Sequence, residues 1–113
     1  MALFALSIPI PAAKVSKWKQ FIDQLEGPRK AEFVANRKRL GVRERTFHQQ
    51  TPMGDMVIVT LEGDNPAAAF AKFGQGSDAF TDWFKTEVMD IHGVDLAAPP
   101  AEPFPVQVVD SGA

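Results

Sequence analysis

Two short apolar segments constrain the fold of this chain more strongly than any other feature of its sequence. Residues 3–10 and 56–61 place apolar side chains on both alternating faces, and both segments are shorter than an ordinary helix. A strand that is apolar on both faces has to be covered on both faces. The pattern therefore predicts two strands at the centre of a sheet.

Two helical regions, each interrupted near its middle, lie between the predicted strands. Gly27-Pro28 interrupts the first region and residues 74–76 interrupt the second. Asn65-Pro66 is typical of a helix start, whereas Gly41 and Gly93 are typical of helix ends. The apolar stripes, with most members three or four residues apart, are Val15, Trp18, Phe21, Ile22 and Leu25 in the first region and Phe80, Trp83, Phe84, Val88 and Ile91 in the second.

Two further segments are predicted to be edge strands. Residues 42–51 alternate without a clean apolar face, and the run from Phe104 to Val109 is marked by Pro103 and Pro105, which cannot donate a backbone hydrogen bond. The resulting order of strands and split helices is that of a ferredoxin-like βαββαβ unit. We therefore predict one α+β domain over residues 1–113, with a four-stranded antiparallel sheet, split helices on one face, and a linker at 97–103 before the last edge strand.

Helices on one face leave the other face of the predicted sheet uncovered. The two central strands would then expose an apolar patch larger than a soluble monomer normally tolerates. A second copy of the same face is the simplest partner, so we predict a homodimer.

Charge is unevenly distributed along the sequence, because residues 1–45 hold ten basic and four acidic side chains, whereas the remainder holds two basic and ten acidic side chains. Such asymmetry favours the steering of partners or antiparallel self-pairing.

The composition narrows the classes of function. The 113 residues include no cysteine, which excludes disulfides, thiolate nucleophiles and thiolate metal sites. The two histidines lack metal-ligand spacing, and we expect no metal and no cofactor. An isoelectric point near 5.6 disfavours a nucleic acid partner. The first residues lack the positive charge of a signal peptide and the length of a membrane span, so we expect a cytoplasmic protein without a membrane partner.

Four segments resemble a known family. They are 40–44 (Leu-Gly-Val-Arg-Glu), 61–64 (Leu-Glu-Gly-Asp), 80–84 (Phe-Thr-Asp-Trp-Phe) and 91–95 (Ile-His-Gly-Val-Asp). Together they resemble an uncharacterised bacterial family of the dimeric α+β barrel superfamily, over roughly residues 3–96. That superfamily includes cofactor-free monooxygenases, stress-responsive dimers and haem enzymes. The resemblance implies a fold and a dimer rather than one activity.

His48 is the most suggestive candidate for chemistry. It shares one face of its predicted strand with Glu44, so a carboxylate could orient or charge the imidazole. If Gln50 pairs with Asp55, Arg43 faces Glu62 in a surface ion pair. A slip by one residue would instead place Glu44 opposite Glu62 beside His48, which is the arrangement of an acid/base site. The sequence leaves both registers open.

Three hypotheses for function follow. The first is a homodimeric module that is structural or binds a small apolar ligand in a cavity between sheet and helices. The second is a cofactor-free enzyme, monooxygenase-like or isomerase-like, that uses His48 with Glu44 or Glu62 in a cavity lined by Trp18, Phe47 and Ile58. The third is an interaction protein that uses the basic helix from residue 29 to 39. A haem ligated by His48 is conceivable by analogy with the superfamily alone.

Overall fold

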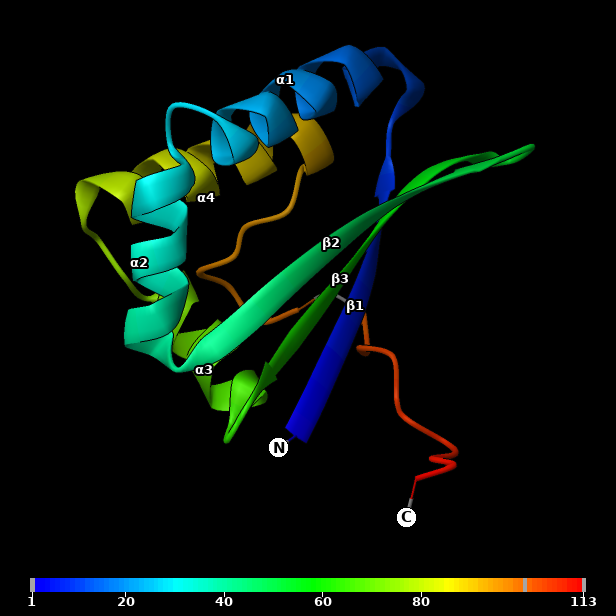
Figure 1. The fold of residues 1–113 in the computed structure, drawn as a ribbon. Coiled ribbons are helices and arrows are strands. Elements are labelled where there is room, and N and C mark those ends of the chain that lie inside the picture. Colours follow the sequence, from blue (N-terminus) through cyan, green and yellow to red (C-terminus); the bar gives the residue numbers. More distant parts are fainter. Residues whose placement is uncertain (1, 101, 113) are drawn as a thin grey trace.

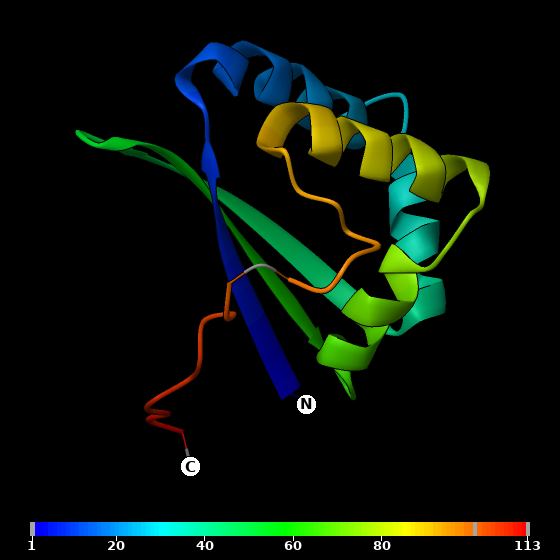
Figure 2. The same ribbon diagram turned by 180° about the vertical axis from the view of Figure 1, so that it is seen from behind.

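The computed structural model describes residues 2–100 and 102–112. In this part of the chain, one antiparallel sheet carries a layer of helices on one of its faces (Figures 1 and 2). The strands are β1 (Ala2–Ile10), β2 (Val42–Thr51) and β3 (Gly54–Gly63), and the helices are α1 (Val15–Glu26), α2 (Lys30–Leu40), α3 (Pro66–Gly74) and α4 (Ala79–His92), with a 3₁₀ turn at Ala12–Lys14. The chain is thus an α+β protein.

Local sequence signals set the ends of the helices. The Asn65 side chain accepts a hydrogen bond from the Ala68 amide at the start of α3, where Pro66 occupies the first turn. Asp78 caps α4 in the same way through the amide of Thr81. Gly41 ends α2 and Gly93 ends α4 in the left-handed conformation, with φ of 74° and 69°. These predicted helix boundaries are confirmed to within a few residues.

The sheet has the order β1-β3-β2, so β3 is its central strand. Gln50 lies opposite Asp55 and Arg43 lies opposite Glu62. This is the first of the two registers that the sequence left open, and the slipped register does not occur. Glu44 is therefore opposite Leu61, and no pair of adjacent carboxylates forms in this hairpin.

The predicted fourth strand is absent from the described part of the chain. Residues 103–110 have no regular secondary structure, so the prediction of a four-stranded ferredoxin-like sheet, and of an α+β barrel built on it, is wrong. Phe104 packs on Phe4 and Phe70, with ring centroids 5.0 and 5.6 Å away. The chain then crosses the free edge of β1 and runs away from it (Figure 2). With Pro103 and Pro105 unable to donate hydrogen bonds, this segment is poorly suited to pair, and β1 is an edge strand.

The two faces of the sheet have different environments. Leu6, Val57 and Leu61 point toward the helices and are buried in the core. Side chains alternate along a strand, so Leu3 and Phe47 point to the opposite face. Leu3 and Phe47 are 55% and 53% exposed, and the helices all lie on the other side (Figure 1). The sheet therefore has one covered and one open face.

The uneven charge of the sequence is partly used within the molecule. Lys14 and Lys17 of the N-terminal part form ion pairs with Asp90 on α4, and Lys17 also approaches Glu87. These pairs link the 3₁₀ turn and α1 to α4, and α1 and α4 lie side by side over the sheet (Figures 1 and 2). They are about 40% exposed, so each contributes little to stability. Among the described residues, no helix combines the length and the hydrophobicity that crossing a membrane requires.

Candidate functional site

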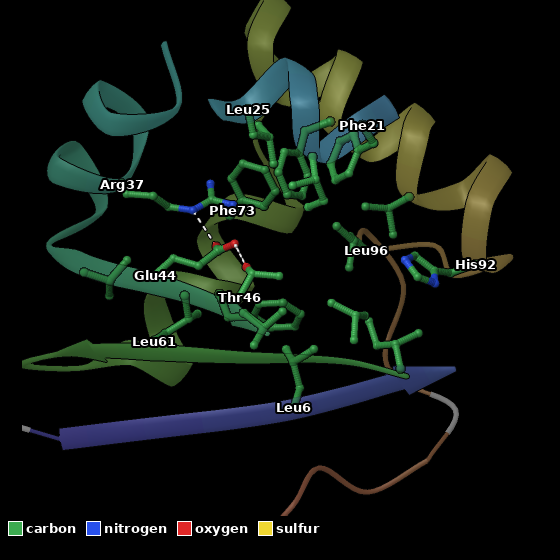
Figure 3. Close-up of a pocket in the computed structure, with 18 of the residues that line it drawn as sticks. Leu6, Phe21, Leu25, Arg37, Glu44, Thr46, Leu61, Phe73, His92 and Leu96 are labelled. Carbon is green, nitrogen blue, oxygen red and sulfur yellow. Dashed lines mark hydrogen bonds and ion pairs between the residues drawn. The ribbon is translucent and has the colours of Figure 1, made fainter. Parts of the chain in front are cut away.

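A cavity of about 80 Å³ lies between the sheet and the helices. Its wall is almost entirely apolar, and the polar residues that line it are Arg37, Glu44, Thr46 and His92. The apolar wall is formed by Leu6, Ile8, Val42, Val57, Val59 and Leu61 of the sheet, by Trp18, Phe21, Ile22, Leu25, Leu40, Ala69, Phe70, Phe73, Phe84 and Val88 of the helices, and by Leu96 after α4. Figure 3 shows the polar residues on two opposite sides, with Arg37, Glu44 and Thr46 on one side and His92 on the other.

Arg37 is a buried cation on α2. Its side chain is only 9% exposed, and its guanidinium lies 4.4 Å from the centre of the Phe73 ring. The rings of Phe33 and Phe84 lie 4.9 Å from it. Arginine is well suited to such a place because its flat, weakly hydrated cation stacks on aromatic faces. Three aromatic rings and one carboxylate thus replace the water that this charge would otherwise hold.

Glu44 is the carboxylate that neutralises Arg37. Arg37 Nε donates to Glu44 Oε1 at 2.8 Å, and the Thr46 hydroxyl donates to Glu44 Oε2 at 3.2 Å. The Glu44 side chain is 7% exposed, so protein atoms shield the ion pair from water. The dashed lines in Figure 3 mark both contacts. Burial of two charges is tolerated here because each has more than one partner.

A chain of polar contacts continues from Arg37 to the start of α4. Arg37 donates to the Asn36 side-chain oxygen, and the Asn36 amide donates to the Thr81 hydroxyl at 3.5 Å. Thr81 in turn donates from its amide and its hydroxyl to Asp78, at 3.0 and 2.8 Å. These two hydrogen bonds lower the pKa of Asp78 below its ordinary value. The polar network therefore connects α2, β2 and α4.

His92 forms the polar side of the cavity opposite to the ion pair. It is the last residue of α4, and its Nδ1 lies 3.1 Å from the carbonyl oxygen of Pro9. A carbonyl only accepts, so Nδ1 carries the hydrogen. Burial lowers the pKa of His92, while the hydrogen bond to Pro9 works weakly in the opposite direction. The ring is therefore neutral at neutral pH, with its second nitrogen, Nε2, deprotonated.

The structure separates the residues of the predicted acid/base site. Glu44 lies in the cavity, but its partner is Arg37 rather than His48. Glu62 lies on the open face of the sheet, 3.1 Å from Arg45. His48 Nε2 lies 2.8 Å from Asp55 Oδ2, near the end of the hairpin. The three candidates thus have three different partners and share no site.

The predicted cavity residues are also divided between the two faces of the sheet. Trp18 is buried and lines the cavity, and its ring centre lies 4.7 Å from that of His48. Phe47 and Ile58 are opposite each other in the β2–β3 ladder but point to the open face. Phe47 and Ile58 are close to each other because β2 pairs with β3. They do not reach the cavity because side chains alternate between the two faces of a strand.

Arg37 is a site residue that the sequence analysis did not select, because charged helical residues are usually solvated. The signal lies in its spacing from two apolar residues of α2. Phe33 and Leu40 are seven residues apart and pack toward the core, so Asn36 and Arg37 between them necessarily share that face. Asn36 and Arg37 are indeed the buried residues of α2.

Comparison of the chain with protein-family models, with curated proteins and with solved structures finds no match in any of the three. The resemblance to the dimeric α+β barrel superfamily stays a prediction.

Replacement of Arg37 by methionine tests the buried ion pair. Arg37→Met leaves the Glu44 carboxylate buried without its cation, and we expect a loss of about 3 to 5 kcal/mol in the free energy of unfolding. Adding Glu44→Gln should restore a large part of this loss in the double variant. Arg45→Met is the matched control, because its partner Glu62 is 38% exposed, and it should cost less than about 1 kcal/mol. Equal losses from Arg37→Met and Arg45→Met in urea denaturation would contradict this account.

The lowered pKa of His92 predicts a loss of stability in mild acid. Between the lowered folded-state pKa and the ordinary value of 6.5, the unfolded chain binds a proton that the folded chain does not. The free energy of unfolding should therefore fall as the pH is lowered through that window and be constant above it. His92→Asn should flatten this part of the curve, while Asp78 acts only at the more acidic pH where carboxylates titrate. A variant that loses as much stability as the wild type on acidification to about pH 5.5 would refute the assignment.

Proposed function

We propose that this protein is a homodimeric module that binds a small, mainly apolar molecule in the cavity between sheet and helices. The observation that carries the proposal is the cavity itself, which places an apolar wall between two sets of polar side chains. Such a combination of apolar surface with a few fixed polar groups is typical of ligand pockets.

The size of the cavity limits the ligand. Its volume of about 80 Å³ is smaller than the pockets of drug-sized ligands and roughly half that of an engineered cavity that binds benzene. A molecule with a handful of non-hydrogen atoms matches this space. The nearly complete apolar wall favours a ligand whose body is a hydrocarbon, because such a wall offers dispersion contacts but few hydrogen bonds.

The second part of the proposal, the homodimer, rests on the open face of the sheet. Leu3 of β1 and Phe47 of β2 are more than half exposed there, and Ile58 of β3 lies between their strands. These apolar side chains come from all three strands of one uncovered face, and such a face is a candidate interaction surface. A second copy of the same face, related by a two-fold axis, is the partner that we propose for it.

The scattered positions of His48, Glu44 and Glu62 give an acid/base mechanism no common site, so binding is the function that we propose.

Occupation of the cavity can be tested with xenon and benzene as probes. We expect both to shift the methyl NMR signals of Leu6, Val57 and Leu61 in a saturable way, because these side chains line the cavity. Ala69→Leu adds three carbons to the cavity wall and should abolish the shifts, whereas Ala67→Leu on the exposed side of α3 should not. Shifts that are absent in the wild type, or that persist unchanged in folded Ala69→Leu, would remove the proposed function.

Phe47→Glu tests the dimer. A carboxylate beside Ile58 on the open face cannot be desolvated without large cost, so the variant should be a monomer in sedimentation equilibrium at a concentration where the wild type is a dimer. Met53→Glu is the control, because Met53 is 99% exposed in the β2–β3 turn and should leave the dimer intact. A wild-type protein that sediments as a monomer at micromolar concentration would contradict the proposed dimer.

A further inference from the structure

The polar atoms of the cavity differ in how far they are already engaged. On one side, Arg37, Glu44 and Thr46 donate to and accept from one another. On the other side, His92 uses only Nδ1, toward the Pro9 carbonyl. Among the described residues, Nε2 of His92 has no hydrogen-bond partner, although the ring is turned toward the cavity (Figure 3). This nitrogen is an acceptor that a ligand can engage without breaking an existing hydrogen bond.

The chemistry of that nitrogen follows from its neighbour. In a neutral imidazole one nitrogen carries the hydrogen and the other is an acceptor. The Pro9 carbonyl holds the hydrogen on Nδ1, which leaves Nε2 as an acceptor. The lowered pKa of His92 keeps the ring in this neutral form at neutral pH. The cavity therefore offers a hydrogen-bond acceptor at the end of an apolar wall.

Resting on the proposed function, we propose that the ligand is a small alcohol whose hydroxyl donates to His92 Nε2 and whose hydrocarbon part lies against the apolar wall. A carboxylate ligand would bring an anion toward the lone pair of Nε2 and into the cavity that already holds Glu44. An ammonium ligand would lose its hydration to a wall that is almost wholly apolar. A neutral hydroxyl avoids both costs.

Three probes of similar size separate the proposed contact from general apolar binding. Cyclopentanol can donate a hydrogen bond, cyclopentanone can only accept one, and benzene offers no polar group. We expect cyclopentanol to bind about two- to tenfold more tightly than cyclopentanone, as one hydrogen bond typically contributes. The dissociation constants are measured by NMR titration of the cavity methyl groups, at a pH of about 7.5 where His92 is neutral.

Variants of His92 identify the atom responsible. His92→Asn keeps a side-chain amide that can donate to the Pro9 carbonyl but lacks a group in the place of Nε2. The preference for cyclopentanol should therefore disappear in His92→Asn, while benzene should still bind. His92→Gln, whose longer side chain can place an oxygen near the position of Nε2, should retain part of the preference. Far-UV circular dichroism and the benzene titration show that each variant still folds around its cavity.

The outcomes distinguish the two proposals. Benzene binding with equal affinities for cyclopentanol and cyclopentanone leaves the binding function in place and overturns the alcohol. A preference for cyclopentanone overturns it too, and assigns the polar contact to a donor such as the Trp18 indole. A preference for cyclopentanol that survives unchanged in His92→Asn overturns the role of His92. Failure of xenon and of all three of these probes to bind removes the proposed function itself.

Discussion

The buried ion pair between Arg37 and Glu44 is the interaction on which the rest of this structure depends. It fixes α2 on β2, because neither charge can leave the other without being stranded in an apolar interior. The aromatic rings around Arg37 come from α2, α3 and α4, so the same cation also sets how three helices pack. Asn36 and Thr81 extend the contact to the start of α4. One side of the cavity is thereby made of groups that cannot collapse into it.

Features that depend on local sequence could be predicted, and features that depend on distant partners could not. The helix cap at Asn65 and the left-handed glycines at helix ends involve residues a few positions apart, and the structure contains them. The pairing of residues 104–109 with β1 would have joined segments about a hundred residues apart. Its β-prone valines suggested a strand, but Val106, Val108 and Val109 are 79% to 89% exposed. Strand propensity alone does not supply a partner.

The candidate site shows the same division. The alternation along β2 correctly places Glu44 and His48 on one face of the strand, and Trp18 is correctly assigned to the interior. The partner of Glu44 was not predictable from the strand alone, because it comes from the preceding helix. Charged residues on a helix are usually solvated, and for this reason the burial of Arg37 between Phe33 and Leu40 was not predicted. Helical phase is a better guide here than residue type, since positions between two core residues share their face.

The cavity leaves part of the protein interior without packing contacts. The side chains leave about 80 Å³ between them, so the residues of the wall lack part of the dispersion contacts that a filled core would make. A larger apolar side chain in the wall would fill this space without touching the ion pair or His92. The ion pair and His92 could thus be kept in a protein without this cavity. A ligand of the kind that we propose would supply these dispersion contacts, and its binding would then stabilise the folded state.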